Sequence, residues 1–183
     1  MKVTETPLQG VLIVEPSVYS DSRGYFFESW QQKRYIEVGI ETEFVQDNES
    51  QSVQGVVRGL HYQLAPWGQA KLVRVVQGRI FDVAVDLRQN SPTFMKWFGV
   101  ELDDTSKKQL FIPRGFAHGF SVLSETAIFA YKCDNVFNRE ADRTINLKDP
   151  QLNINWKLGE IVPIVSDKDK NAPFLKDAEI NFK

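Results

Sequence analysis

The sequence predicts an all-β protein of the sandwich or barrel kind. Its 183 residues include 13 Phe, 5 Tyr and 4 Trp, residue types that favour strands. Val-rich runs separated by regularly spaced Gly and Pro are typical of short strands joined by tight turns. About ten such runs follow one another without strand–helix–strand alternation, so we expect antiparallel closure as a jelly roll or barrel. In such a fold the ligand site lies inside, lined by alternate residues of several strands.

Composition limits the class of protein further. An apolar fraction of 42% over residues 1–183 supports one domain with a substantial core. The net charge of −2 excludes a global attraction to nucleic acid or to an anionic membrane. The only apolar run near the N-terminus, residues 11–14, is too short for a signal sequence or a membrane span, so we expect a cytoplasmic protein. The single cysteine, Cys133, excludes an intrachain disulfide and a Cys-x-x-Cys site.

Local patterns place the elements in order. Residues 29–38 are the best helical candidate, and we expect one short helix there. Residues 71–88 form two strand-like runs broken at Gln77-Gly78, which predicts a hairpin. A second such unit follows Pro113-Arg114-Gly115, with strands over 116–122 and 126–133. In the run before Arg88, alternation predicts a strand with two different faces, one with Phe81, Val83, Val85 and Leu87, the other with Asp82, Ala84 and Asp86.

Only two histidines occur, His61 and His118, and each lies in a strand-like run near glycines. Either ring could be packed and hydrogen-bonded for structure alone. However, Pro113, Gly115 and His118 form a P-x-G-x-x-H pattern that resembles the second signature of the cupin barrels. The segment from Gly59 to Gly78 occupies the place of the first signature.

The first signature departs from that of the metal-binding cupins, which supply H-x-H and then a Glu seven residues before a glycine. Here the corresponding residues are His61-Tyr62-Gln63, and Lys71 lies seven residues before Gly78. An ammonium group at a ligand position repels a divalent cation and cannot coordinate it. We therefore expect no metal and a barrel that carries out proton chemistry.

Several sequence blocks, in order along nearly the whole chain, resemble the dTDP-4-dehydrorhamnose 3,5-epimerase family. Their order and spacing together make the resemblance specific. The blocks are DSRGYFFE (21–28), FVQDN (44–48), VRGLHYQ (57–63), KLVR (71–74), FDVAVD (81–86), FAHGF (116–120), YK (131–132) and SDKD (166–169).

The resemblance implies a metal-free, cofactor-independent cupin-type jelly roll, usually a homodimer, that acts on a dTDP-linked 4-keto-6-deoxyhexose on the route to dTDP-rhamnose. Carbons 3 and 5 of that sugar flank the C4 ketone, so their protons are acidified. Removing one proton gives an enolate that can be reprotonated from the other face. This chemistry needs two opposed proton carriers and an oxyanion stabiliser.

Four residues match the catalytic positions of the family. His61 would be the base, Asp169 the carboxylate that fixes its tautomer, Tyr131 the proton donor and Lys71 the cation that holds the enolate oxygen. Each has a plain structural alternative. Asp169 could be a solvated loop residue in a charged run, Tyr131 an ordinary core tyrosine, and Lys71 a side chain that faces solvent.

Other residues match family positions that contact the nucleotide sugar, because arginine can fork onto diphosphate oxygens and amides can read the base and the sugar hydroxyls. Their alternatives are solvated surface charges or a turn formed by the Asp-Asn pair. The candidates are Arg23, Glu28, Gln46, Asp47, Asn48, Arg58 and His118, with Asp142 and Lys168 as weaker ones.

Two departures from the family bear on the reaction. Val136-Phe137 replaces a usual Tyr-Tyr pair, which removes a hydroxyl near the sugar, and Asp142 stands where glutamate is expected. They leave open an epimerase that acts at C3 only or at C5 only. A non-catalytic cupin that merely binds a nucleotide sugar, and a metal-dependent cupin oxygenase, are the alternatives from other classes. Asp82 and Asp86 stay unassigned, as partners of His118 or as solvent-facing residues.

Overall fold

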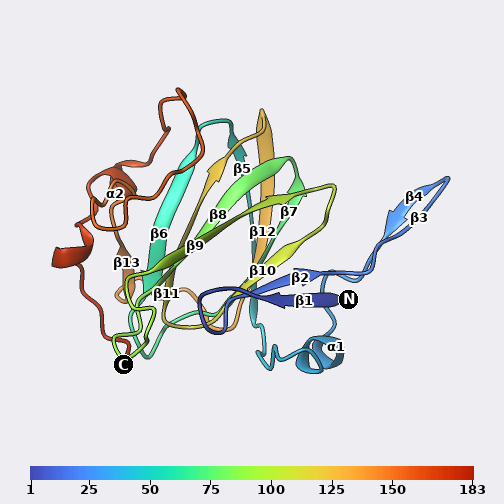
Figure 1. Ribbon diagram of the computed structural model, residues 1–183, viewed down its shortest axis with the longest axis horizontal. Coiled ribbons are helices and arrows are strands. Elements are labelled where there is room, and N and C mark those ends of the chain that lie inside the picture. Colours follow the sequence, from blue (N-terminus) through green and yellow to red (C-terminus); the bar gives the residue numbers. More distant parts are fainter.

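The computed structural model describes residues 1–183, and it consists of two antiparallel β-sheets packed face to face (Figure 1). The first sheet has six strands in the order β1 (Lys2–Glu5), β2 (Leu12–Glu15), β10 (Gln109–Ile112), β7 (Lys71–Gln77), β12 (Thr126–Cys133) and β5 (Gln46–Val53). The second has five, in the order β13 (Asp142–Thr144), β6 (Val57–Gln63), β11 (Phe116–Val122), β8 (Arg79–Asp86) and β9 (Trp97–Asp103). The predicted all-β fold class is confirmed.

The strands were predicted correctly around Gly78, but the two predicted hairpins are wrong. Strand β7 pairs with β10 and β12, whereas β8 pairs with β9 and β11. Likewise β11 belongs to the five-stranded sheet and β12 to the six-stranded sheet. Each tight turn therefore carries the chain from one sheet to the other, as in sandwiches whose corners are made by strands that switch sheets.

Three apolar clusters result from this layering. One lies between the sheets and includes Val73, Val75, Ala84 and Phe129. A second covers the outer face of the five-stranded sheet, where Val83 and Val85 pack against C-terminal residues such as Leu152, Trp156 and Leu175. The third covers part of the outer face of the six-stranded sheet around Tyr35, Leu72 and Phe111. Both faces of β8 are buried for this reason.

The remaining elements lie at the periphery. The single predicted helix is shorter than expected, α1 (Gln32–Ile36), and a second one-turn helix, α2 (Asp167–Lys170), begins at the N-cap Ser166. A short 3₁₀ helix, η1 (Leu175–Asp177), follows. A two-stranded ribbon, β3 (Tyr19–Asp21) with β4 (Gly24–Phe26), projects away from the sheets (Figure 1). None of the helices has the length and apolar character needed to cross a bilayer.

Candidate active site

A histidine–carboxylate pair lies on the inner side of the five-stranded sheet. His61 is on β6, and its Nε2 lies 2.6 Å from Oδ1 of Asp169 on α2. The backbone N–H of Gly59 donates to the other carboxylate oxygen at 3.3 Å. Asp169 is only 3% exposed, whereas a third of the His61 side chain is open. Burial raises the pKa of Asp169, but the hydrogen bonds from His61 and Gly59 outweigh it and hold that pKa below its ordinary value.

The burial of Asp169 excludes the alternative of a solvated loop residue. The Oγ of Ser166 accepts a hydrogen bond from the Asp169 backbone N–H at 3.1 Å, which fixes the start of α2. The short helix thereby directs this carboxylate at a ring that lies 108 positions earlier in the sequence. Local sequence contained no signal for this contact.

Strands β6 and β11 approach each other unusually closely at two glycines. A Cβ on Gly59 would lie 2.5 Å from the Cα of Gly119, and a Cβ on Gly119 would lie 2.7 Å from the carbonyl oxygen of Arg58. The glycines that flank both histidines in the sequence are therefore required by backbone contact. They bring His61 and His118 into register as neighbours across the two strands.

The second histidine forms a buried pair of its own. Nε2 of His118 lies 2.9 and 3.0 Å from the two carboxylate oxygens of Asp82 on β8. Burial lowers the pKa of His118 against the opposing effect of Asp82, and nearby Lys71 lowers it further. Asp82 is thus a partner of His118, while Asp86 accepts hydrogen bonds from Arg88, Ser91 and Thr93.

Lys71 and Tyr131 lie on the inner face of the opposite, six-stranded sheet. Lys71 shares its face of β7 with the buried Val73, so the solvent-facing alternative is excluded. Its Nζ lies 5.7 Å from the centroid of the Tyr131 ring and makes no hydrogen bond or ion pair within the chain. Burial lowers the pKa of Lys71 and raises that of Tyr131. The alternation that predicted an inward Tyr131 beside Phe129 is confirmed by the packing of the two rings, 5.4 Å apart.

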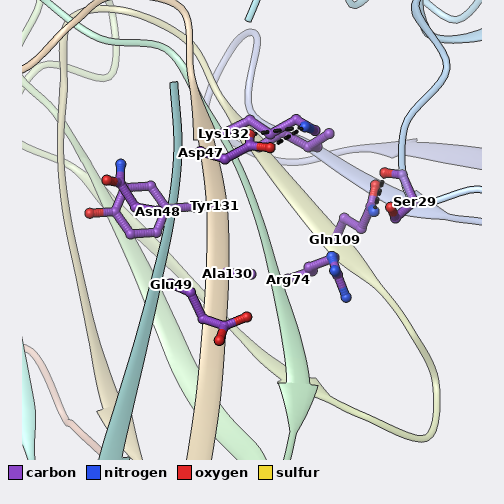
Figure 2. A pocket seen from close by; sticks show the side chains of 10 residues that line it. Ser29, Asp47, Asn48, Glu49, Arg74, Gln109, Ala130, Tyr131 and Lys132 are labelled. Atoms are coloured by element: carbon purple, nitrogen blue, oxygen red, sulfur yellow. Dashed lines mark hydrogen bonds and ion pairs between the residues drawn. The ribbon is translucent and has the colours of Figure 1, made fainter. Parts of the chain in front are cut away.

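The residues predicted from the FVQDN block divide between two faces of β5. Gln46 and Asn48 face inward and contact each other, with Gln46 Nε2 3.1 Å from Asn48 Oδ1. Asp47 points to the outer face, where both its oxygens accept from Nζ of Lys132 at 2.9 and 3.0 Å. Figure 2 shows this separation, with Asn48 and Tyr131 on one side of the strands and Asp47 and Lys132 on the other. The structure therefore does not bring Asp47 to the site around His61.

The other predicted contacts are also divided. Lys168 forms an ion pair with Asp142 next to β6, because β13 pairs with that strand. Arg58 is exposed, and its Nε donates to Ser52 Oγ at 3.0 Å. Arg23, on the projecting ribbon, pairs with Asp21, and Glu28 pairs with Arg34 of α1. Within one chain neither Arg23 nor Glu28 joins the inner site.

Sequence reasoning did not predict a hollow on the outer face of the six-stranded sheet (Figure 2). It has a volume of about 290 Å³ and is lined by Ser29, Glu49, Arg74, Gln109 and their neighbours. Arg74 has no ion pair there. The alternation of β7 contained the signal, because Arg74 lies on the face opposite Lys71. No group of three or more His, Cys, Asp or Glu side chains in the structure could hold a metal ion.

The fold and this arrangement define a jelly-roll protein of the cupin type with ionisable side chains on both inner faces. Residues 5–177 match the dTDP-4-dehydrorhamnose 3,5-epimerase family. The chain belongs to that family. It is 52% identical over 180 residues to the dTDP-4-dehydrorhamnose 3,5-epimerase of Shigella flexneri, with 98% of each chain covered.

Solved structures agree with this assignment. The 3,5-epimerase of Legionella pneumophila, crystallised with dTDP-4-keto-L-rhamnose, superposes with a TM-score of 0.95 at 48% identity and covers 100% of this chain and 98% of its own. A 3′-monoepimerase from Streptomyces bikiniensis, in complex with dTDP-quinovose, gives a TM-score of 0.88 at 32% identity and covers 93% and 86%. The shared fold therefore supports epimerases that differ in the number of centres they invert.

Proposed function

We propose that this enzyme inverts C3 and C5 of dTDP-4-dehydro-6-deoxy-D-glucose to give dTDP-4-dehydro-L-rhamnose. One observation carries the proposal: the His61–Asp169 pair lies on one inner face of the sandwich, and Lys71 and Tyr131 lie on the other. A sugar ring held between the sheets would meet a base on one side and a proton donor on the opposite side. Inversion beside a ketone requires this arrangement.

In the proposed first step His61 removes a proton next to the ketone. With Nε2–H donating to Asp169 at 2.6 Å, Nδ1 keeps its lone pair and accepts the proton from C3 or C5. The electron pair of the C–H bond forms a C=C bond, and the C4 carbonyl oxygen becomes an enolate oxygen. The ionised Asp169 then stabilises the imidazolium that has formed.

Lys71 and Tyr131 complete the cycle. The Lys71 ammonium has no carboxylate partner within the chain, so its charge is free to stabilise the enolate oxygen. The Tyr131 hydroxyl has no internal hydrogen bond, and its raised pKa keeps it protonated. It delivers a proton to the carbon from the face opposite His61, and the enolate reverts to the ketone. Solvent then reprotonates the Tyr131 phenolate and takes the proton from the His61 imidazolium. Neither step needs a metal or a redox cofactor.

The nucleotide part of the substrate would extend toward polar residues at the edge of the sandwich. Gln46, Asn48 and Arg58 offer amide and guanidinium groups there, and Lys168 lies beside Asp142. Arginine and lysine suit diphosphate oxygens, and amides suit the base and hydroxyls. His118, with Nε2 already bound to Asp82, contributes through its remaining ring nitrogen or through packing.

We further propose a homodimer in which the β3–β4 ribbon of one subunit reaches the site of the other. The ribbon carries Arg23, whose side chain is 88% exposed. Tyr19, Tyr25 and Phe26 on the same ribbon are also exposed, which is costly for a lone chain and typical of a contact surface. In the dimer, Arg23 on the ribbon and Glu28 just after it would contact the nucleotide bound in the other subunit.

The cytoplasm remains the proposed location. The substrate is a charged nucleotide sugar, and the one cysteine is a buried free thiol, which suits a reducing compartment.

Incubation of the purified enzyme with the 4-keto sugar nucleotide in deuterated water tests the proposed reaction. We expect deuterium at both C3 and C5 without added metal or nicotinamide, and at least about a hundredfold slower incorporation for His61→Asn, the loss typical of a missing general base. Deuterium at only one of the two carbons would identify a 3-only or a 5-only epimerase, the alternative that Phe137 on its exposed loop favours. Deuterium at neither carbon, with the sugar nucleotide still bound, would indicate the non-catalytic alternative. A tightly bound metal found by elemental analysis would revive the oxygenase alternative.

A further inference from the structure

The loop between β12 and β13 forms part of the rim of the site. It leaves β12 just after Tyr131 and enters β13 at Asp142, so it connects a proposed proton donor to a proposed binding residue. No backbone–backbone hydrogen bond involves any of residues 135–140. Its backbone groups are bonded instead by side chains, some of them from the loop itself, such as Asn138, and others from elsewhere in the fold.

Gln63 supplies two of the hydrogen bonds that hold this loop. It lies on β6, two residues after His61 and on the same face, and is 3% exposed. Its Oε1 accepts from the backbone N–H of Asn138 at 2.7 Å, and its Nε2 donates to the carbonyl oxygens of Val136 at 3.2 Å and Trp67 at 2.7 Å. Both amide hydrogens and the carbonyl oxygen are thus used by backbone groups, and the side chain has little left to offer a substrate.

Two other amides hold the same loop, Gln46 from β5 of the other sheet and Gln69 from the segment between β6 and β7. Gln46 Oε1 accepts from the backbone N–H of Phe137 at 3.1 Å, and Gln69 Nε2 donates to the carbonyl oxygen of Asn135 at 2.7 Å. Between these anchors the Phe137 ring is left 58% exposed. A large apolar ring in the open beside Gln46, an inward residue of the site, is a surface that a bound ligand would cover.

We infer that Gln63 is a positioning residue: it fixes the 135–138 loop so that Phe137 packs against the bound sugar nucleotide. This inference rests on the proposed function for its ligand. Gln63 occupies the position of the second histidine in the H-x-H pattern of the metal-binding cupins, and here that position would serve to hold the loop. The amide ties the strand of the base to the rim of the site, so the two move as one unit.

The kinetic test compares Gln63→Met with the wild type. Methionine keeps the length and bulk of the side chain but removes all three hydrogen bonds without adding a charge next to His61. We expect KM for the 4-keto sugar nucleotide to rise about tenfold with a smaller change in kcat, because a loosened wall weakens binding more than chemistry. Gln54→Met is the matched control, since Gln54 Nε2 also holds a backbone carbonyl, that of Leu123 at 2.9 Å, in another loop. Its KM should be unchanged.

A double-mutant cycle tests whether Gln63 acts through Phe137. Phe137→Ala should by itself raise KM, and in its presence Gln63→Met should add little further effect, because residues that act as a unit are not additive. Fully additive effects, or an unchanged KM for Phe137→Ala, would overturn the inference. Because Phe137 is exposed, that second variant still decides the matter if Gln63→Met does not fold.

Hydrogen exchange of the Asn138 amide separates this inference from the proposed function. In Gln63→Met this amide should exchange at least about tenfold faster than in the wild type, with the amides of β6 and β12 unchanged. If the wild type does not epimerise the sugar nucleotide, the proposed function fails while exchange still reports the hold of Gln63 on the loop. Unchanged exchange at Asn138 would overturn the positioning role whatever the activity.

Discussion

At the scale of single residues, the position of Lys71 suits its proposed role in catalysis but lowers the stability of the fold. Its ammonium faces the inside of the sandwich without a hydrogen bond or a carboxylate partner, and burial lowers its pKa. We predict that Lys71→Met increases the free energy of unfolding by roughly 1–3 kcal/mol, the gain seen when buried charges are replaced by apolar groups. The same variant should lose epimerase activity, because Lys71 is the cation that we propose stabilises the enolate oxygen. Urea unfolding and the deuterium assay measure the two effects.

The difference in unfolding free energy between the wild type and Lys71→Met should depend on pH. Because the folded-state pKa of Lys71 lies below the ordinary value of 10.5, the unfolded chain holds this proton more tightly. The wild type therefore becomes more stable relative to Lys71→Met as pH rises from the folded-state pKa toward 10.5. Lys148→Met, at an exposed lysine without an ion pair, should change stability little at any pH. A Lys71→Met variant less stable than the wild type would contradict the argument.

Side-chain direction at the site was predictable from the sequence only where strand alternation applies. The period of two in β12 predicted that Tyr131 shares an inner face with Phe129, which the packing confirms. The same alternation separates Gln46 from Asp47, although family resemblance had grouped them. By contrast, Asp169 lies on a one-turn helix far along the chain, where no period exists. Its pairing with His61 was predicted from the family resemblance alone, and its catalytic role stays a prediction.

At the scale of elements, the sequence predicted strands better than their partners. Turn chemistry at Gln77-Gly78 correctly ended one strand and began the next, yet β7 and β8 lie in different sheets. A tight turn fixes a change of chain direction, while pairing depends on contacts among distant segments. For the same reason the ribbon β3–β4 and the two-faced burial of β8 were not predicted, since the covering segment lies at residues 145–182.

The close approach of β6 and β11 leads to an element-scale prediction. At Gly119 an added Cβ would lie 2.7 Å from Arg58 O and 3.1 Å from Gly59 Cα, both of them backbone atoms. Gly119→Ala should therefore push the two strands apart and cost about 1–3 kcal/mol of stability, as overpacking does. Since His61 and His118 face each other across this pair, activity should fall as well. Denaturant unfolding and the deuterium assay measure both losses.

A second glycine provides the comparison. Gly39 has a φ of +90° and open space around its missing Cβ, so Gly39→Ala adds backbone strain without a clash. We expect it to cost about 1 kcal/mol and to leave catalytic turnover unchanged. If Gly119→Ala were fully active and no less stable than Gly39→Ala, the close contact would not be what holds the two histidines in register.

At the scale of the whole molecule, one chain does not contain every residue that the resemblance assigns to the substrate. Arg23 lies on a ribbon that projects from the sheets, and His61 lies on β6 inside the sandwich (Figure 1). The ribbon presents Tyr19 and Phe26, 67% and 68% exposed. A symmetric dimer would bury these rings and complete two sites at once, each built from both subunits. Composition and strand patterns describe one chain and could not predict this geometry.

Subunit mixing tests whether the site is shared. Arg23→Ala and His61→Ala should each be nearly inactive as homodimers, because every site lacks one group. After unfolding and refolding at equal amounts, about half the dimers should contain one chain of each kind, and one of their two sites would combine an intact His61 with an intact Arg23 from the partner, so about a quarter of wild-type activity should return. If Arg23 instead serves its own subunit, every site in the mixed dimer lacks Arg23 or His61, and no activity returns. Mixing His61→Ala with Lys71→Met is the control, because these two residues face each other within one chain and their mixture should stay inactive in either case.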